Sequence, residues 1–241
     1  MRAPGLALCL LLLPRALPAQ VLISLLFGES LNTGRVEFGL DGGLNLASQR
    51  GADGGGTLRT WHLGFYFDIR LDHPAWLVHT GVIVKSTVGA EDLPPYPLGN
   101  ATLDSVFGGG RVTTRLQYFH LPLLLKYRLP HQFYLEGGGM AGLLRKGTDE
   151  FSATVEEEGD LTHERDVTDD HQRLDAGLVV GAGYRLLGGD GINLGVRYYH
   201  GLVNVLKDDA RPGRHNRSLY LAVGIPVGAG SKEEPAGGEE P

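Results

Sequence analysis

The amino-acid sequence predicts an all-β fold, an eight-stranded antiparallel up-and-down β-barrel that spans a membrane. Three observations predict it. Long stretches alternate apolar and polar residues, as expected where successive side chains of a strand point to opposite faces. The connections between these stretches are short and long in turn, so that the short ones gather at one end. Aromatic residues lie on the apolar parity beside the short turns, as in the girdle at a membrane interface.

Trp61–Leu71 shows the alternation most clearly. Its odd positions are apolar, whereas its even positions include His62, Asp68 and Arg70. A soluble sandwich buries its apolar face, but a transmembrane barrel turns that face to lipid and encloses the polar one. The eight predicted strands are Val36–Leu46, Trp61–Leu71, Trp76–Lys85, Gln117–Arg128, Gln132–Leu144, Leu174–Leu186, Ile192–His200 and Ser218–Val227.

The connections between strands differ in length. Short turns are predicted at 72–74, 129–131 and 188–191, and long polar loops at 48–57, 87–114, 146–172 and 204–217. In outer-membrane barrels the short turns are periplasmic and the long loops lie on the other side. Because the number of strands is even, both termini are expected on the short-turn side, in the periplasm.

The two ends of the chain differ in composition from the barrel. Residues 1–19 are interpreted as a secretory signal peptide, with Arg2 before an apolar run and Leu17–Ala19 as the exit, and cleavage after Ala16 as an alternative. The apolar run is too short to span a bilayer as a helix. Residues 20–35 are predicted to be a periplasmic lead-in, 36–227 the barrel, and 228–241 a disordered acidic periplasmic tail.

Cysteine content and charge exclude several classes of function. The only cysteine, Cys9, lies in the predicted signal, too early for a convincing lipoprotein signal, so a processed chain would have no disulfide or thiolate site. The net charge is −6, and removal of a signal that carries Arg2 and Arg15 would make it −8. Such a charge disfavours binding to nucleic acid or to an anionic surface.

The polar parity is predicted to line a lumen that is only wide enough for side chains. Charges there must pair, because an unpaired buried charge is costly. We interpret them as a structural plug, with a proton path or a small-ligand pocket as the alternative. The predicted lumen network comprises Glu37, Asp41, Asp68, Arg70, Lys85, Lys126, Arg128, Glu136, Asp175, Arg185 and Arg197, with His62, His79 and His120 among them. The predicted periplasmic aromatic girdle comprises Trp76, Tyr127, Phe133 and Tyr184.

No motif predicts a catalytic, cofactor or metal site. The histidines are not at metal-ligand spacing, and His163-Glu164 lacks the helical repeat of a zinc protease. Neither a nucleophile elbow nor a phosphate-binding loop is present. The loop 146–172 is strongly acidic and is interpreted as a solvated surface. Divalent-cation binding among lipopolysaccharide head groups and a partner-docking lid are the alternatives, although no calcium-loop spacing occurs.

Three segments carry a resemblance to a known family. Leu25–Gly28, Glu37–Asn45 and Phe119–Tyr127 resemble the PorT-like outer-membrane β-barrel family of Bacteroidetes-type Gram-negative bacteria, and Leu-Pro-Leu-Leu-Leu-Lys-Tyr at 121–127 is the most specific part. The resemblance implies an eight-stranded barrel in the outer membrane. It also implies a link to protein export, the role of the named family member, and no catalytic motif. The implied partners are outer-membrane lipid, lipopolysaccharide and export-machinery proteins.

The sequence therefore favours a non-enzymatic outer-membrane barrel that is structural or accessory to protein export. Two alternatives remain open. The first is a membrane-embedded lipid-modifying enzyme, for which His200 and Thr80 are the polar candidates on the lipid-facing parity. The second is a soluble periplasmic barrel that binds a hydrophobic ligand, which would require the apolar parity to face inward.

Overall fold

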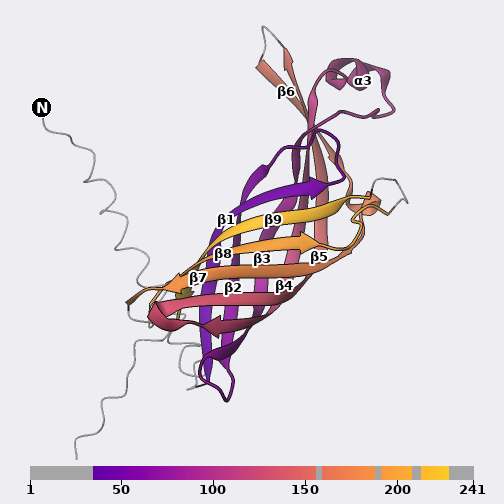
Figure 1. The fold of residues 1–241 in the computed structure, drawn as a ribbon. Helices are drawn as coiled ribbons and strands as arrows, with labels where there is room; N and C mark the ends of the chain where they lie inside the picture. The colour runs from indigo at the N-terminus through magenta and orange to yellow at the C-terminus, as the bar shows by residue number, and fades with distance from the viewer. Residues whose placement is uncertain (1–34, 156–158, 188–190, 208–212, 228–241) are drawn as a thin grey trace, which may run out of the picture.

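Eight antiparallel strands close into a barrel in the computed structural model, which describes residues 35–155, 159–187, 191–207 and 213–227 (Figure 1). Strands adjacent in the barrel pair with each other, and β1 pairs with β9 to close the ring. The predicted eight-stranded up-and-down barrel is therefore confirmed. Its strands are β1 (Val36–Arg50), β2 (Leu58–Arg70), β3 (Trp76–Leu93), β4 (Arg111–Arg128), β5 (Phe133–Val155), β7 (Leu174–Arg185), β8 (Asn193–Gly201) and β9 (His215–Pro226).

The predicted signal peptide, nearly all of the lead-in and the tail 228–241 lie outside the described residues. The described helices are the α-helix α3 (Ala101–Phe107) and the 3₁₀ turns η3 (Pro130–Gln132) and η4 (Thr168–Asp170). Asn100 caps α3, since its side chain accepts from the N–H groups of the second and third following residues. Within the described ranges, no helix is both long enough and apolar enough to cross a membrane.

The apolar parity faces outward along the barrel. Leu123 is 64% exposed and Leu135 is 50% exposed, whereas Asp68 and Lys126 on the other parity are 2% and 3% exposed. Because the exposed wall is apolar and the buried lumen carries the charges, the barrel has the sidedness of a membrane protein. The soluble periplasmic carrier, which needed the apolar parity inside, is therefore the wrong reading.

Part of the sheet projects beyond the barrel. The loops predicted at 87–114 and 146–172 are wrong in part, because β3, β4 and β5 continue into them and a ninth strand, β6 (Gly159–Asp166), pairs with β5. We call the distal ends of β3, β4 and β5, together with β6 and α3, the cap. Figure 1 shows α3 and β6 at one end of the barrel. The cap has its own apolar core, formed by Ala90, Leu93, Phe107, Val112, Phe151 and Ala153.

The polarity of the alternation is inverted in the cap. On β4, Leu121 and Leu123 are exposed on the outer wall, whereas Val112 in the cap is buried on the opposite parity. Outside the bilayer the solvent is water, so charged side chains such as Arg115 take the outer face and apolar ones turn inward. The sequence pattern of the cap is therefore that of a small soluble sheet.

Candidate functional site

Arg197 lies at the centre of the lumen. From β8 it reaches two carboxylates on other strands: its Nη1 lies 2.5 Å from Asp41 Oδ2 on β1, and its Nε lies 2.5 Å from Glu136 Oε1 on β5. All three side chains are at least nine-tenths buried. Charge-assisted hydrogen bonds of this kind are the strong ones, so Arg197 ties three strands together through the interior.

A second ion pair adjoins the first. Lys126 Nζ on β4 lies 2.7 Å from Asp68 Oδ2, and His79 Nδ1 lies 2.6 Å from Asp68 Oδ1. His79 Nε2 is 3.2 Å from Arg197 Nη2. Because a guanidinium only donates, Nε2 of His79 is the acceptor, and its Nδ1 carries the proton donated to Asp68. His79 thereby joins the two ion pairs into one network.

A third ion pair lies toward the short-turn end. Arg185 Nη2 is 2.6 Å from Glu37 Oε2, and the Tyr66 hydroxyl donates to Glu37 Oε1 at 3.2 Å. Asn193 Nδ2 in turn donates to the Tyr66 oxygen at 3.1 Å. The sequence prediction of the network considered charged residues and histidines and therefore did not include Tyr66 and Asn193. Both residues occur on the polar parity of their strands, which is the sequence signal that could have identified them.

Three further residues of the predicted network take part in none of these ion pairs. Asp175 is buried but accepts from Asn216 Nδ2 at 2.9 Å, apart from the cations. Arg128 is half-buried at the end of β4, and Arg70 is exposed at the end of β2. Among the three histidines, His120 is fully buried and its ring stacks on Tyr118 at 5.3 Å.

Lys85 does not belong to the lumen network, and that prediction is wrong. Its side chain is exposed, and Nζ lies 3.5 Å from the ring centroid of Trp61, which is on the outer wall. The physical reason is a β-bulge between Ile83 and Ser86, where the register of β3 against β4 shifts. An extra residue reverses the facing of every later side chain. Lys85 therefore makes a cation–π contact on the outer surface.

The lumen is filled around the network. A small cavity beside Asp41, His79 and Arg197 has a volume of about 10 Å³, at most enough for one water molecule. Apolar and tyrosine side chains occupy the remaining length of the lumen in two clusters. The first cluster consists of Ala47, Leu58, Val88, Leu116, Tyr118, Leu144 and Val205, and the second of Ile83, Leu124, Met140, Val179, Tyr199 and Tyr220.

The four aromatic residues predicted as a girdle form two cross-strand pairs at the short-turn end. Trp76 is opposite Tyr127 with ring centroids 4.6 Å apart, and Phe133 is opposite Tyr184 with centroids 5.0 Å apart. Three of them, Trp76, Phe133 and Tyr184, are exposed on the outer wall. Rings at strand ends on an apolar wall have the geometry of an interfacial belt.

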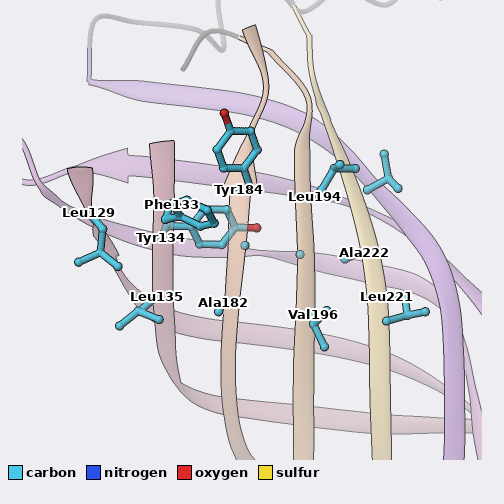
Figure 2. Close-up of a pocket in the computed structure, with 13 residues that line it drawn as sticks. Leu129, Phe133, Tyr134, Leu135, Ala182, Tyr184, Leu194, Val196, Leu221 and Ala222 are labelled. Atoms are coloured by element: carbon cyan, nitrogen blue, oxygen red, sulfur yellow. The ribbon is translucent and has the colours of Figure 1, made fainter. Parts of the chain in front are cut away.

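Next to Phe133 and Tyr184 the outer wall is hollowed. A groove of about 580 Å³ crosses β5, β7, β8 and β9 (Figure 2). Its sides are apolar, and Figure 2 shows Ala182 between Leu135 and Val196, whose side chains are larger. The groove exists because Ala182 is small where the outer residues around it, Leu135 and Val196 among them, are large.

The floor of this groove is thin. Tyr134, Gly183, Gly195 and Ala222 follow one another in register across four strands. A Cβ atom on Gly183 would lie 2.3 Å from the Tyr134 hydroxyl, so the phenol ring lies directly against the glycine backbone from the lumen side. Lys126 Nζ is 4.3 Å from the centroid of the same ring. Tyr134 thus separates the groove from the charged network.

The two polar residues that the sequence offers for a membrane-embedded enzyme, Thr80 and His200, do not lie together. Thr80 is on β3 and His200 is on β8, and three strands lie between them in the sheet. Among the described residues, no group of three or more His, Cys, Asp or Glu side chains could hold a metal ion.

The cap carries a polar cluster outside the bilayer. The Tyr96 hydroxyl donates to Asp149 Oδ2 at 2.7 Å, and the Thr114 hydroxyl donates to Asp149 Oδ1 at 2.6 Å. Burial raises the pKa of Tyr96, and the hydrogen bond to Asp149 raises it further. Arg165 of β6 lies over the Tyr96 ring at 5.3 Å. These contacts fix β6 and the chain before α3 on β5.

Comparison with known proteins identifies the family. A search of curated proteins found no match. Among solved structures, the chain is similar to Ail, the attachment invasion locus protein of Yersinia pestis, with 11% identity, a TM-score of 0.44 and coverage of 80% of this chain and 99% of Ail. It is similar to Neisserial surface protein A with 11% identity, a TM-score of 0.41 and coverage of 79% and 96%.

The family model for the outer membrane protein beta-barrel domain matches residues 27–207, which is more than half of the chain. The outward apolar wall described above agrees with it, since that wall faces the lipid of the membrane. The chain belongs to the outer membrane protein beta-barrel domain family and is an integral barrel of the outer membrane.

Proposed function

We propose that this chain is a non-enzymatic outer-membrane barrel with a plugged polar lumen, structural or accessory to protein export in the manner of PorT-like proteins. The observation that carries the proposal is Arg197, which joins Asp41 and Glu136 across the interior. Opening a solute path would separate these groups and break their charge-assisted hydrogen bonds. The functional contacts of the protein are therefore made by its outer surfaces and not by the lumen.

The PorT-like assignment has support in the segment that carries the resemblance. Leu121, Leu123 and Leu125 of that segment are exposed on the outer wall, and Lys126 is the cation that binds Asp68. The segment thus combines lipid contact with a central lumen contact on one strand.

We also propose that both termini are periplasmic and that the cap faces the cell exterior. The support is the aromatic girdle beside the short turns and the solvent-type polarity of the cap. An epitope inserted near Gly159 should be detected on intact cells, and one placed after Gly230 only after permeabilisation. Exposure of the second epitope with protection of the first would reverse the topology.

Planar-bilayer recording tests the plugged lumen. Purified protein should show no sustained large single-channel conductance, because the lumen is filled by paired charges and packed side chains. A variant with Lys126, Glu136 and Arg197 all changed to alanine is the matched control, and it should conduct ions if it folds. Reproducible porin-like steps from the unchanged protein would refute the plug.

A deletion strain separates the export role from the structural role. If the barrel is an export accessory, secreted proteins should accumulate in the periplasm of the deletion strain and return to the medium on complementation. If it is structural, export should be normal and sensitivity to bile salts or detergent should rise. A strain with neither defect would contradict both forms of the proposal.

A further inference from the structure

β6 forms one edge of the nine-stranded sheet. It pairs with β5 from Thr148 opposite Asp166 to Val155 opposite Gly159, without a register shift. Among the strands that the structure describes, β5 is its one neighbour. Figure 1 shows β6 projecting from the end of the barrel. The backbone along its other side therefore has no strand to pair with in the described part of the chain.

The hydrogen bonds identify which backbone groups face this open edge. Val167 N–H donates to Gly147 O at 3.0 Å, so the backbone at Val167 points toward β5. In an antiparallel pair, alternate residues direct both N–H and C=O to the same side. Thr162, Glu164 and Asp166 therefore direct these groups away from β5, toward the open edge.

The cap holds β6 in an extended shape. The ring of His163 lies 6.0 Å from that of Phe107 and 6.4 Å from that of Phe151, and Arg165 lies over Tyr96. These contacts all use the parity of β6 that faces the core of the cap. A strand fixed in this way has already lost the conformational entropy that a binding surface otherwise loses when it associates.

The open edge lacks several of the usual protections against pairing. Natural sheet edges are blunted by charged side chains, lysine above all, and by proline, bulges or very short strands. Residues 159–166 contain neither proline nor lysine, the strand has eight residues, and its register is regular. Its exposed side chains include Glu164 and Asp166, and its one cation, Arg165, lies 3.4 Å from Asp170. The edge is thus open and acidic.

We propose that the open edge of β6 binds an extended basic segment of another protein as an added β-strand. In strand addition, main-chain hydrogen bonds supply affinity and the flanking side chains supply specificity. Here the acidic side chains select a basic segment. Two copies paired through this edge would bring acidic side chains together, which disfavours a homodimer. The proposal is independent of the lumen plug and of export; only its access from the cell exterior depends on the proposed topology.

Direct binding tests the proposal with the purified full-length barrel in nanodiscs of neutral lipid. The probe is a short fluorescent peptide of alternating lysine and threonine, followed by anisotropy. Neutral lipid removes the attraction of lysine for an anionic bilayer. The matched peptide has proline in place of every threonine, which keeps the charge but prevents ladder formation.

Three variants divide the backbone contribution from the charge contribution. Thr162→Pro removes an N–H that faces the open edge and leaves the bonds to β5, whereas Thr162→Ala keeps that N–H. The first should weaken binding by about tenfold or more, and the second should change it by less than about twofold. Glu164→Lys should weaken binding of the lysine peptide and strengthen binding of a glutamate–threonine peptide. Anomalous migration on unheated gels confirms that each variant is folded.

Three results would overturn the proposal. Equal binding of the proline peptide, or undiminished binding by Thr162→Pro, would reduce the attraction to charge alone. Dimers of the unchanged protein that dissociate on Thr162→Pro would assign the edge to a second copy. Failure of the conductance or export experiments above would leave these binding results unaffected.

Discussion

The hydroxyl of Tyr134 occupies the space that a side chain at Gly195 would need. A Cβ on Gly195 would lie 2.6 Å from that oxygen, whereas its next contact would be an ordinary 3.7 Å. The two residues therefore specify each other: the tyrosine lies against the wall because β8 has glycine there.

A double-mutant cycle measures this relationship. Gly195→Ala should destabilise the barrel by about 1–3 kcal/mol through overpacking. In a Tyr134→Phe background the clashing oxygen is gone, so the same change should cost much less, with a clear coupling energy. Urea unfolding in lipid vesicles gives the four free energies. Additive effects would show that the wall relaxes without reference to the ring.

The lumen network makes Arg197 a sensitive position. Arg197→Gln leaves Asp41 and Glu136 buried without their cation, and we expect a loss of about 3–5 kcal/mol in the free energy of unfolding. Arg70→Gln is the matched control, because Arg70 is exposed at a strand end, and it should change stability by less than about 0.5 kcal/mol. Equal effects of the two changes would mean that the lumen pairing contributes no stability.

Neighbouring residues of β4 should respond to opposite changes. Leu123→Arg puts a charge on the lipid face, which costs about 2–4 kcal/mol near the midplane. It should slow insertion and depend on bilayer thickness. Lys126→Leu leaves lipid contact intact but removes the cation from Asp68, so the inserted barrel should unfold more easily. A neutral Leu123→Arg variant in vesicles would show that the lipid face is wrongly assigned.

A single substitution in the cap should destabilise the cap and leave the stability of the barrel unchanged. Tyr96→Phe removes a hydrogen bond to the buried carboxylate of Asp149, a contact to a charged group that contributes about 1.5–3 kcal/mol. Hydrogen exchange should quicken in α3 and β6 and stay slow in β1 and β9. Tyr184→Phe on the outer wall serves as the control for loss of a phenol. Faster exchange throughout would contradict an independent cap.

The eight strands could be predicted because the bilayer imposes one rule along the whole barrel. Alternation alone put Leu123 outside and Lys126 inside, since side chains of a strand must take opposite faces. No knowledge of strand partners was needed. The partners themselves could not be predicted: Arg197 and Asp41 are separated by 156 residues, and their meeting depends on the register of three strands.

The rule fails where its physical basis ends. Lys85 lies at a bulge that depends on pairing with other strands. The local sequence pattern therefore still predicts that the Lys85 side chain faces the lumen. Beyond the bilayer the preferred face inverts, and Val112 is buried on the parity that is polar in the membrane. A search for inverted alternation would have found the cap end of β4. The groove could not be found from sequence, because it arises where the small Ala182 lies beside larger residues of neighbouring strands, and those neighbours depend on strand register.

The seam between β1 and β9 joins the two ends of the barrel sequence, from Gly39 opposite Pro226 to Arg50 opposite His215. Until β9 arrives, the other seven strands have two unpaired edges, which hydrocarbon does not tolerate. Loop-closure entropy rises only slowly with chain length, so the long sequence separation between β1 and β9 adds little to the free-energy cost of closing the barrel. The larger cost is that the strand edges stay unpaired until β9 is present. Insertion should therefore be all-or-none, and a chain that ends before His215 should give no smaller barrel, only an uninserted polypeptide.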